Sequence, residues 1–565
     1  MTSNAPATRS GRFFIGYEYE VIPQGMKEGF RQSMAWLHTW TGLVVGWVLF
    51  FMFVTGTAGY FHYEITRWME PERPLVEALP TAERAQMISL ALDQLEQRAP
   101  NAANWDITLP HYSPLSRGWQ DFSIRWEDLP EPGHDHGARG NATLNPLTGE
   151  HLESTPVRAT GGGELLYEMH YRLHYMDLLL AYYLVGICTL LMFMAIITGV
   201  ITHKKIFKDF FTFRPGKGQR SWLDAHNVIS VMALPFFIMI TYSGLVFFDT
   251  TYMPTSMAVL YGPDRESRDQ YFDDLYAQNH DHQAARRPQA PLSEMLASAD
   301  AAWGEGQVKS LLIQQDTGEA PRVEISRIDV NELRWYDGEK QVFNADTGEA
   351  LPSAPYGTPT SRTRQVITAL HEGRFAGPWL RWLYFAAGLL GCAMIATGLV
   401  LWTVKRRKQH ELPGTGSINM RLIEALNVAT IAGLPLGVAG YFWANRLLPV
   451  DIAERANWEA NVLFLLWGEA FLYACFRDIR KAWVEILWLA AAAFALIPLL
   501  NLLTTDKHLG LTLPAGEWVL AGFDLSMLGL GIAFGWMAIK VRRRWLANER
   551  KANPTTHPAR MEKSA

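Results

Sequence analysis

The stretch WLHTWTGLVVGWVLFFMFVTG (residues 36–56) determines the fold expected for this 565-residue chain. It is long and apolar enough for a membrane-spanning helix, which needs ~20 such residues. His38 stands near its start, and Gly56 follows eighteen residues later. A distant stretch, WLDAHNVISVMALPFFIMITYSG (222–244), again places a histidine eighteen residues before a glycine. This shared spacing indicates an internal duplication.

The duplication extends into the segments that follow. AIITGVITHKK (195–205) matches MIATGLVLWTVKR (394–406), so two further apolar stretches also correspond. Between the paired stretches, NPLTGEHL (145–152) matches NADTGEAL (344–351). Each repeat is therefore predicted to consist of a helix, an outer domain and a second helix.

The apolar stretches predict the fold class, a mostly α-helical membrane protein with about eight transmembrane helices. The first four helices belong to the two repeats, and the last four form an appended module at 422–540. The expected spans are 35–61, 176–201, 226–248, 377–403, 422–444, 459–476, 483–503 and 518–540.

Basic residues predict the direction of these spans. They follow every second span, in HKKIFKDFFTFRPGKGQR (203–220), VKRRK (404–408), RDIRK (477–481) and KVRRRW (540–545). Because Lys and Arg are enriched in cytoplasmic loops, we expect this side to be cytoplasmic. Both termini then lie in the cytoplasm, and the cytoplasmic parts are 1–34, 202–225, 404–421 and 541–565. The loop at 202–225 is also expected to contact anionic membrane lipids.

Two long segments, 62–175 and 249–376, then face the opposite, extracytoplasmic side. AERAQMISLALDQLEQ (82–97) has apolar residues at helical spacing, whereas DFSIRW (121–126) and RVEISRI (322–328) alternate as half-buried strands do. We expect two small α+β extracytoplasmic domains, each with one helix over a short antiparallel sheet. The NxxTGE motifs are predicted to be turns between strands.

Seven histidines stand at the ends of the first four spans: His38, His62, His170, His174, His203, His226 and His371. Ionisable residues at membrane spans are rare and usually functional. Imidazole is also the usual axial ligand of haem that is not covalently attached. The three cysteines lie in apolar spans and no CxxCH motif occurs, which excludes covalent c-type haem. A haem at these histidines would be held without a covalent bond, and we expect haem b.

A pseudo-twofold axis between the repeats would bring equivalent histidines together. His38 and His226 would meet at the cytoplasmic face. At the outer face His371 would meet His170, or His174 if the second helix is continuous, and we favour His174. Each pair would place two imidazoles on opposite sides of an iron, so two haems are expected. A packing role remains the alternative for each histidine.

His62 and His203 have no counterpart in the other repeat, where Thr250 and Trp402 stand. They remain candidates as alternative ligands or as neighbours of ligands, but ordinary interfacial histidines are the favoured interpretation. His62 follows His38 by 24 residues, which is ~36 Å along a helix, so the two cannot bind one iron.

Several of these motifs together resemble the PepSY-associated transmembrane family, over residues 30–410. They are the WLHTWTG opening, the LH at 370–371, the TG at 198–199 and 397–398, and the paired NxxTGE motifs. The resemblance implies an inner-membrane haem protein that reduces ferric siderophores and releases iron as Fe(II). PepSY modules also occur as peptidase-associated regulatory domains. A cofactor-free regulatory or binding protein is therefore an open alternative.

The sequence contains no Walker A motif, no GxGxxG after a strand, and neither HExxH nor GxSxG. Electrons would then come from a separate cytoplasmic donor or a membrane quinol. The acceptor would be a ferric siderophore or another iron chelate, and nothing indicates a nucleic-acid partner. Arg172, Arg374 and Arg381 are candidates to attract an anionic chelate, or to anchor the membrane edge.

Two other functions remain as alternatives. One is a transporter that uses the appended helices, suggested by polar and small residues in them: Asn427, Gly437, Gly440, Asn445 and Glu469. The other is a cupric reductase that uses the H-x-H of GHDHG (133–137) and NHDHQ (279–283), since imidazole suits copper. For both H-x-H motifs a solvated loop is the favoured interpretation.

Overall fold

The structure is a computed structural model. It describes residues 29–75, 80–113, 118–131, 137–153, 156–203, 210–276, 282–328, 333, 339–352, 359–410 and 418–552. Several predicted features lie outside these residues. They are most of both tails, positions 204–209 of the basic loop, the two histidines of GHDHG, and the first histidine of NHDHQ.

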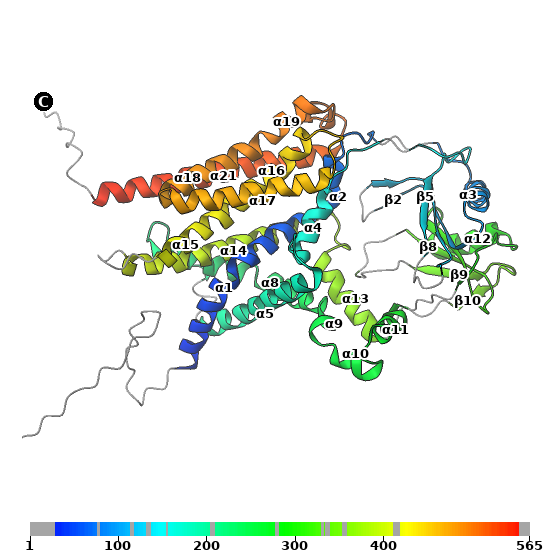
Figure 1. Cartoon of the computed structure of the whole chain (residues 1–565), viewed down its shortest axis with the longest axis horizontal. Coiled ribbons are helices and arrows are strands. Elements are labelled where there is room, and N and C mark those ends of the chain that lie inside the picture. Colours follow the sequence, from blue (N-terminus) through cyan, green and yellow to red (C-terminus); the bar gives the residue numbers. More distant parts are fainter. Residues whose placement is uncertain are drawn as a thin grey trace, which may run out of the picture.

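The protein is a multi-pass membrane protein, as predicted. Within the described residues, seven helical segments are long and apolar enough to cross a membrane, and one bent pair of helices makes an eighth. The spans of the repeats are α1 (Phe30–Gly59), α5 (Leu178–Thr202), the bent pair α7 (Gln219–Met232) and α8 (Leu234–Val246), and α14 (Pro378–His410). The remaining spans are α15 (Ile418–Val428) with η1 (Ala429–Gly433) and α16 (Leu434–Leu447), α17 (Arg455–Phe476), α18 (Ile479–Ala495) with α19 (Ile497–Thr504), and α21 (Trp518–Ala552). Figure 1 shows these helices side by side, with a β-sheet beyond one end of the bundle.

The third span is bent by 68° between α7 and α8. Pro235 stands in the first turn of α8, and proline is tolerated there because its missing N–H is not needed. The bend separates His226, on α7, from Gly244, on α8. The two residues therefore serve different ends of the bundle.

The second span begins later than predicted, and this changes the position of His174. Helix α4 (Gly162–Arg172) ends before it, and both Leu173 and Tyr175 adopt left-handed backbone conformations, with φ of 47° and 61°. A new helix, α5, then starts behind Asp177, whose side chain accepts a hydrogen bond from the third residue of the helix. His174 therefore lies in a turn and not on the second membrane helix.

The two outer segments are each α+β, as predicted, but they share one sheet. Its strand order is β10-β9-β8-β7-β1-β4-β5, and β6 also pairs with β7. The first segment provides β1 (Ala102–Thr108), β4 (Ser123–Asp128) and β5 (Arg139–Thr143). The second provides β6 (His282–Gln283), β7 (Val308–Asp316), β8 (Arg322–Arg327), β9 (Lys340–Asn344) and β10 (Ala350–Leu351). A small hairpin of β2 (His111–Ser113) and β3 (Gly118–Gln120) lies beside them.

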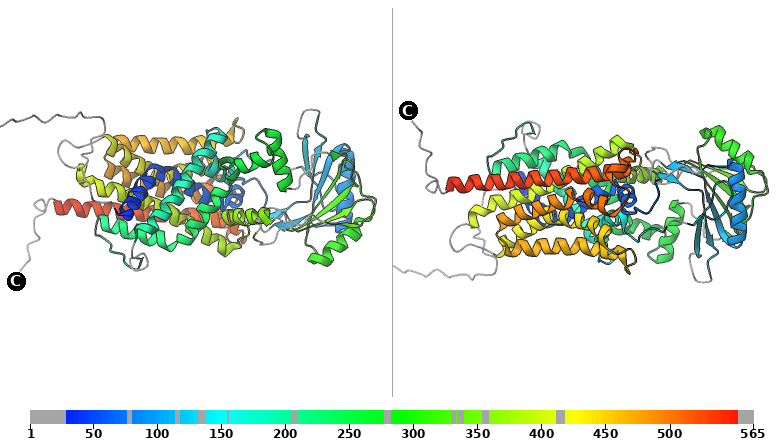
Figure 2. Two further views of the ribbon diagram at one scale, coloured as in Figure 1. Left: turned by 90° about the horizontal axis from the view of Figure 1, so that it is seen from below. Right: turned by 90° about the horizontal axis from the view of Figure 1, so that it is seen from above.

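The sheet is continuous because β1 pairs with β7 in antiparallel register, from Asn104 opposite Gln314 to Thr108 opposite Ser310. This pairing covers the edge strand that each segment would otherwise expose. Helices α3 (Arg84–Arg98) and α12 (Leu292–Trp303) pack on the sheet face turned away from the membrane bundle (Figure 2). One hydrophobic core thus joins both segments.

The NxxTGE motifs form equivalent turns, as predicted. The side chains of Asn145 and Asn344 each accept hydrogen bonds from backbone N–H groups two and three residues later. Gly149 and Gly348 follow with φ of 72° and 76°, a left-handed conformation that favours glycine. The second turn connects β9 to β10.

Shorter helices lie between the bundle and the sheet. They are α2 (His62–Met69), α4, α9 (Asp249–Tyr252), α10 (Thr255–Leu260), α11 (Arg265–Tyr276) and α13 (Pro359–Glu372). Helices α15 to α21, including the short α20 (Leu509–Thr512), form what we call the C-terminal module (residues 418–552). This module packs beside α1, α14 and α2.

Candidate functional site

The structure brings His38 of α1 and His226 of α7 together, with ring centres 6.2 Å apart. The Nδ1 of His38 lies 2.8 Å from the carbonyl oxygen of Ala195, and the Nδ1 of His226 lies 2.9 Å from that of Met394. A carbonyl can only accept, so Nδ1 carries the proton in each ring. The lone pair is then on Nε2, which is the arrangement of a metal-binding imidazole. We call these two residues the inner pair.

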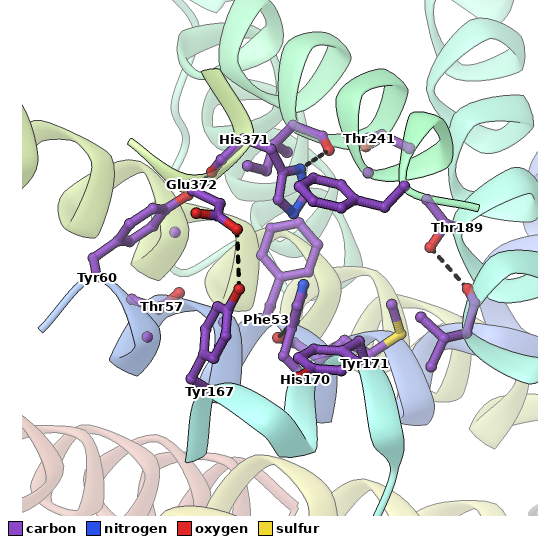
Figure 3. Close-up of a pocket in the computed structure, with 18 of the residues that line it drawn as sticks. Phe53, Thr57, Tyr60, Tyr167, His170, Tyr171, Thr189, Thr241, His371 and Glu372 are labelled. Atoms are coloured by element: carbon purple, nitrogen blue, oxygen red, sulfur yellow. Dashed lines mark hydrogen bonds between the residues drawn. The ribbon is translucent and has the colours of Figure 1, made fainter. Parts of the chain in front are cut away.

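A second pair lies at the end of the bundle nearer the sheet. His170 of α4 and His371 of α13 have ring centres 6.0 Å apart and face each other, with Phe53 alongside (Figure 3). Their Nδ1 atoms lie 2.7 Å from the carbonyl oxygen of Met52 and 3.0 Å from that of Ile240. We call these residues the outer pair.

Each of the four imidazoles contacts a glycine in a membrane span of the same repeat, and this span is not the one that the histidine belongs to or precedes. The acceptor carbonyl always stands four residues before that glycine, and the glycines are Gly199, Gly398, Gly56 and Gly244. A Cβ at Gly56 would lie 2.6 Å from Nδ1 of His170, and one at Gly244 would lie 2.9 Å from Cε1 of His371. At the inner pair the corresponding distances to Cε1 are 3.1 and 3.2 Å. Glycine is needed here because the imidazole occupies the space of a side chain.

A hydroxyl residue precedes every one of these glycines. The four are Thr198, Thr397, Thr55 and Ser243. Each hydroxyl donates chiefly to the carbonyl oxygen four residues earlier, at 2.6–2.8 Å. It also lies 3.1, 2.9, 3.2 and 3.3 Å, respectively, from the carbonyl oxygen that accepts from the imidazole. The TG and SG dipeptides are therefore parts of four equivalent histidine seats. Sequence analysis found the dipeptides, but did not predict this role.

The geometry of each pair suits one metal ion between two imidazoles. Two imidazole nitrogens bound at about 2 Å on opposite sides of a metal place the ring centres roughly 6 Å apart. Among the described residues, no group of three or more His, Cys, Asp or Glu is placed to hold a metal ion. Two imidazoles placed in this way would fit a macrocycle such as haem, which carries its remaining metal ligands itself.

The outer pair also has the space and the charge state for a ligand. It lines a cavity of about 490 Å³, within the ~300–1,000 Å³ usual for cofactor sites. Gly56, Gly59, Gly244 and Gly388 line it as well. Burial, and then the nearby His170, lower the pKa of His371 to about 3. Burial also lowers the pKa of His170, so both rings are neutral at physiological pH.

His62 lies at the wall of this cavity but outside the pair. Its Nδ1 is 2.8 Å from the carbonyl oxygen of Gly59, its ring stacks on Tyr167, and its Nε2 is 3.8 Å from a carboxylate oxygen of Glu164. Tyr167 in turn donates a hydrogen bond to Glu372, beside His371. His62 therefore contributes to a polar rim.

His174 and His203 do not join either pair. The ring of His174 stacks on Phe464 of the C-terminal module, with centres 5.6 Å apart, and does not face His371. The structure therefore places His170, and not the preferred His174, opposite His371. His203 caps the end of α5, four residues beyond Gly199.

The three arginines considered for chelate attraction all form ion pairs. Arg381 pairs with Glu64, and both side chains are buried, so this arginine is an internal contact. Arg374 pairs with Glu372 at the cavity wall, and Arg172 pairs with Glu168, one turn earlier in α4.

A second cavity, of about 410 Å³, is polar and lies on the outer sheet. It is lined by Tyr63, Thr108, His111, Ser113, Gln120, Asp121, Ser123, Arg125, Asn141, Thr143 and Lys309. The strand residues among them stand on the opposite side of the sheet from core residues such as Ile107 and Ile124, and so on the face turned toward the bundle. Tyr63 is adjacent to His62, which lines the first cavity. Neighbouring residues of α2 therefore line the two cavities.

Comparison with known proteins places the chain in a family. The model for the PepSY-associated TM region matches residues 35–405, which is more than half of the sequence. The chain belongs to the PepSY-associated transmembrane family. It is also similar to an uncharacterised protein of Pseudomonas aeruginosa, PA4219, with 26% identity over 388 residues. That alignment covers 66% of this chain and 92% of the relative. The match to the family model ends at residue 405, before the C-terminal module. The family region therefore consists of the two repeats, which contain both histidine pairs.

The structure offers little for the two remaining alternatives. Gly437 and Gly440 pack closely against α17, and Asn427 accepts a hydrogen bond from Trp47. Of NHDHQ, His282 is hydrogen-bonded through its Nδ1 to a carboxylate oxygen of Asp316 at 2.7 Å. These residues have structural partners.

Proposed function

We propose that this protein is a two-haem electron-transfer protein of a bacterial inner membrane that reduces periplasmic ferric chelates. The supporting observation is that four histidines contact a carbonyl group and a glycine in the same way. They form two equivalent pairs of imidazoles at opposite ends of one bundle. Each pair would hold a haem b through its two imidazoles, and the haem would supply one-electron chemistry there. The orientation proposed for the protein in the membrane rests on the basic residues at the ends of every second span, which place both termini in the cytoplasm.

The chain's own residues have defined tasks in this proposal. His38 and His226 bind the group that accepts electrons from a cytoplasmic donor or a membrane quinol. His170 and His371 bind the group that releases them on the periplasmic side. The carbonyl at each Nδ1–H holds the ring in one tautomer and orientation, and it makes Nε2 more basic.

The acceptor in this proposal is a ferric siderophore or another iron chelate, held in the polar cavity of the sheet. Arg125, which also pairs with Asp106, and Lys309 supply two positive charges to a lining that contains one carboxylate, that of Asp121. The hydroxyl and amide side chains suit a ligand rich in oxygen. One electron converts Fe(III) to Fe(II), which hard oxygen ligands hold less tightly. The cavity lies beside α2, so the chelate would sit close to the outer pair.

Haem content of the purified protein tests the proposal. We expect a reduced-minus-oxidised spectrum with a Soret band and two haems per chain. His226→Ala and His371→Ala should each reduce this number to one, because each removes an axial ligand from a different pair. His174→Ala is the matched control and should retain two. A protein without a Soret band would favour the cofactor-free regulatory alternative.

Activity is tested separately, in vesicles that contain the protein with a reductant inside and ferric citrate outside. Formation of Fe(II) outside, measured with an Fe(II)-specific chromogenic chelator, should require both pairs. Reduction of Cu(II) but not of Fe(III) would instead support the cupric alternative.

A further inference from the structure

The short helix α4, which carries His170, is held at its N-terminus by the C-terminal module. Tyr441 of α16 donates its hydroxyl to the carbonyl oxygen of Gly162 at 2.7 Å. Glu459 of α17 accepts from the hydroxyl of Thr160 at 2.6 Å and from the backbone N–H of Gly161 at 3.2 Å. The first N–H groups of a helix have no partners inside the helix, and Glu459 accepts from one of them, that of Gly161. Here the module contacts the backbone at and just before the first turn.

The other end of α4 also contacts the module. The ring of His174 stacks on Phe464 of α17 with an angle of 9° between the planes, and Tyr175 lies against the same ring at 5.1 Å. The hydroxyl of Tyr175 is hydrogen-bonded to Asn461. This turn contains the left-handed Leu173 and Tyr175, a conformation that is unfavourable for residues with a Cβ. The contacts with α17 stabilise it.

A buried network of charges determines how the module meets α2 and α4. Arg455 and Glu459 form an ion pair in which both side chains are completely buried. The network also contains Trp68, Glu72, Arg158, Asn445, Arg446, Asn501 and Asp524. Its three arginines and three carboxylates balance one another. Buried ion pairs are weak evidence for stability, but their best-attested role is to specify one arrangement of packed elements.

The equivalent helix of the second repeat has a different kind of support. Tyr384 of α14 donates to the carbonyl oxygen of Leu370, and Tyr60 donates to that of His371. Helix α13 ends at Gly373, with φ of 64°, where glycine bears no strain. These contacts come from the repeats themselves, and the left-handed position is a glycine.

We propose that the C-terminal module positions α4 and thereby keeps His170 opposite His371. Tyr441, Glu459 and Phe464 are its positioning residues. This gives a role to the four membrane spans of the C-terminal module, which lie outside the family region. The inference rests on the proposed function only in its redox readout, because the placement of α4 can be measured without a cofactor.

Hydrogen–deuterium exchange of the full-length protein in lipid nanodiscs tests the placement. Tyr441→Phe removes one hydroxyl, and we expect amides of 159–176 to exchange about fivefold faster, as the net loss of one hydrogen bond gives. Phe464→Ala should have the same effect on 173–176. Amides of 359–372 should be unchanged in both variants. The matched control is Tyr473→Phe, which removes a tyrosine hydroxyl that contacts Glu485 in the same module and should leave both segments as in the wild type.

Redox titration of the same variants tests the consequence for the site. Tyr441→Phe and Glu459→Gln should shift the midpoint potential of one haem and leave the other, held by the inner pair, unchanged. Unchanged exchange of 159–176 in Tyr441→Phe, or an equal increase in 159–176 and 359–372, would overturn the positioning role. Changed exchange in a protein that contains no haem would support the positioning role and refute the proposed function instead.

Discussion

The inner and outer histidine pairs have the same seats but different supports. The inner histidines stand on α1 and α7, which are parts of membrane spans, so the bilayer and the bundle fix them directly. The outer histidines stand on α4 and α13, short helices that precede the spans α5 and α14. A duplicated seat therefore does not guarantee equivalent sites. The outer site needs contacts from elsewhere, and it opens toward a polar rim.

The two pairs also differ in how tightly the seats fit. The distances from a Cβ added at the glycine to the nearest imidazole atom are 2.6 and 2.9 Å at the outer pair, and 3.1 and 3.2 Å at the inner pair. The outer seats therefore tolerate less added volume. This difference is testable within one molecule, because each pair serves as the internal reference for the other.

Gly56→Val should have the largest effect. The added side chain would occupy the space of the His170 ring, so we expect haem content to fall from two per chain to one, with the inner haem retained. The matched control is Gly42→Val, in the same helix, where an added Cβ meets nothing within 4 Å. Quantitation of extracted haem gives the answer. Loss of both haems in Gly56→Val would mean that the sites are not independent.

Alanine at the opposing glycines should have intermediate effects that rank the two sites. Gly244→Ala needs a shift of His371, at a cost of about 1–3 kcal/mol for added volume in a packed interior. Gly398→Ala needs a smaller shift of His226 and should cost less. The measurement is haem retention during detergent washing or heating. Equal losses from the two variants would show that the difference in fit has no energetic meaning.

Much of this arrangement could be predicted from the sequence because the repeat carries the information. The eighteen-residue spacing in the first and third spans identified His38 and His226 as equivalent, and a pseudo-twofold axis brings equivalent residues together. The TG and SG dipeptides were visible, but their function was not. It depends on a carbonyl four residues earlier, which carries no side-chain signature. A hydroxyl residue before glycine, repeated in all four spans, was the available signal.

Other features depend on contacts between distant segments. His174 was preferred over His170 because the second helix was expected to be continuous. It is interrupted by left-handed residues that are not glycine, and only Asp177, the N-cap, indicated the new start. The shared sheet depends on β1 and β7, which are far apart in the sequence. Arg455 and Glu459 look like ordinary residues near a span end, and only packing shows that they are fully buried.

Removal of the hydroxyl group that precedes one of the four glycines that contact the histidines should have the smallest effect. The direction in which it shifts the midpoint potential of the haem is informative. In the inner seat the carbonyl oxygen of Met394 accepts from Thr397 at 2.9 Å and from His226 at 2.9 Å. Thr397→Val leaves the imidazole as the stronger donor to that carbonyl, because hydrogen bonds to one acceptor compete. The ring then gains basicity, which favours Fe(III), so the midpoint potential of the inner haem should fall.

The outer counterpart sharpens the comparison. The hydroxyl of Thr397 lies almost equally far from the carbonyl oxygens of Ala393 and Met394, at 2.8 and 2.9 Å. That of Ser243 lies 2.6 Å from the carbonyl oxygen of Met239 but 3.3 Å from that of Ile240, so its competition with His371 is weaker. Ser243→Ala should therefore lower the potential of the outer haem by less than Thr397→Val lowers that of the inner haem. Redox titration of both variants measures the two shifts. A rise in either potential would contradict the assignment of the Nδ1–H···O=C bond as the control on ligand basicity.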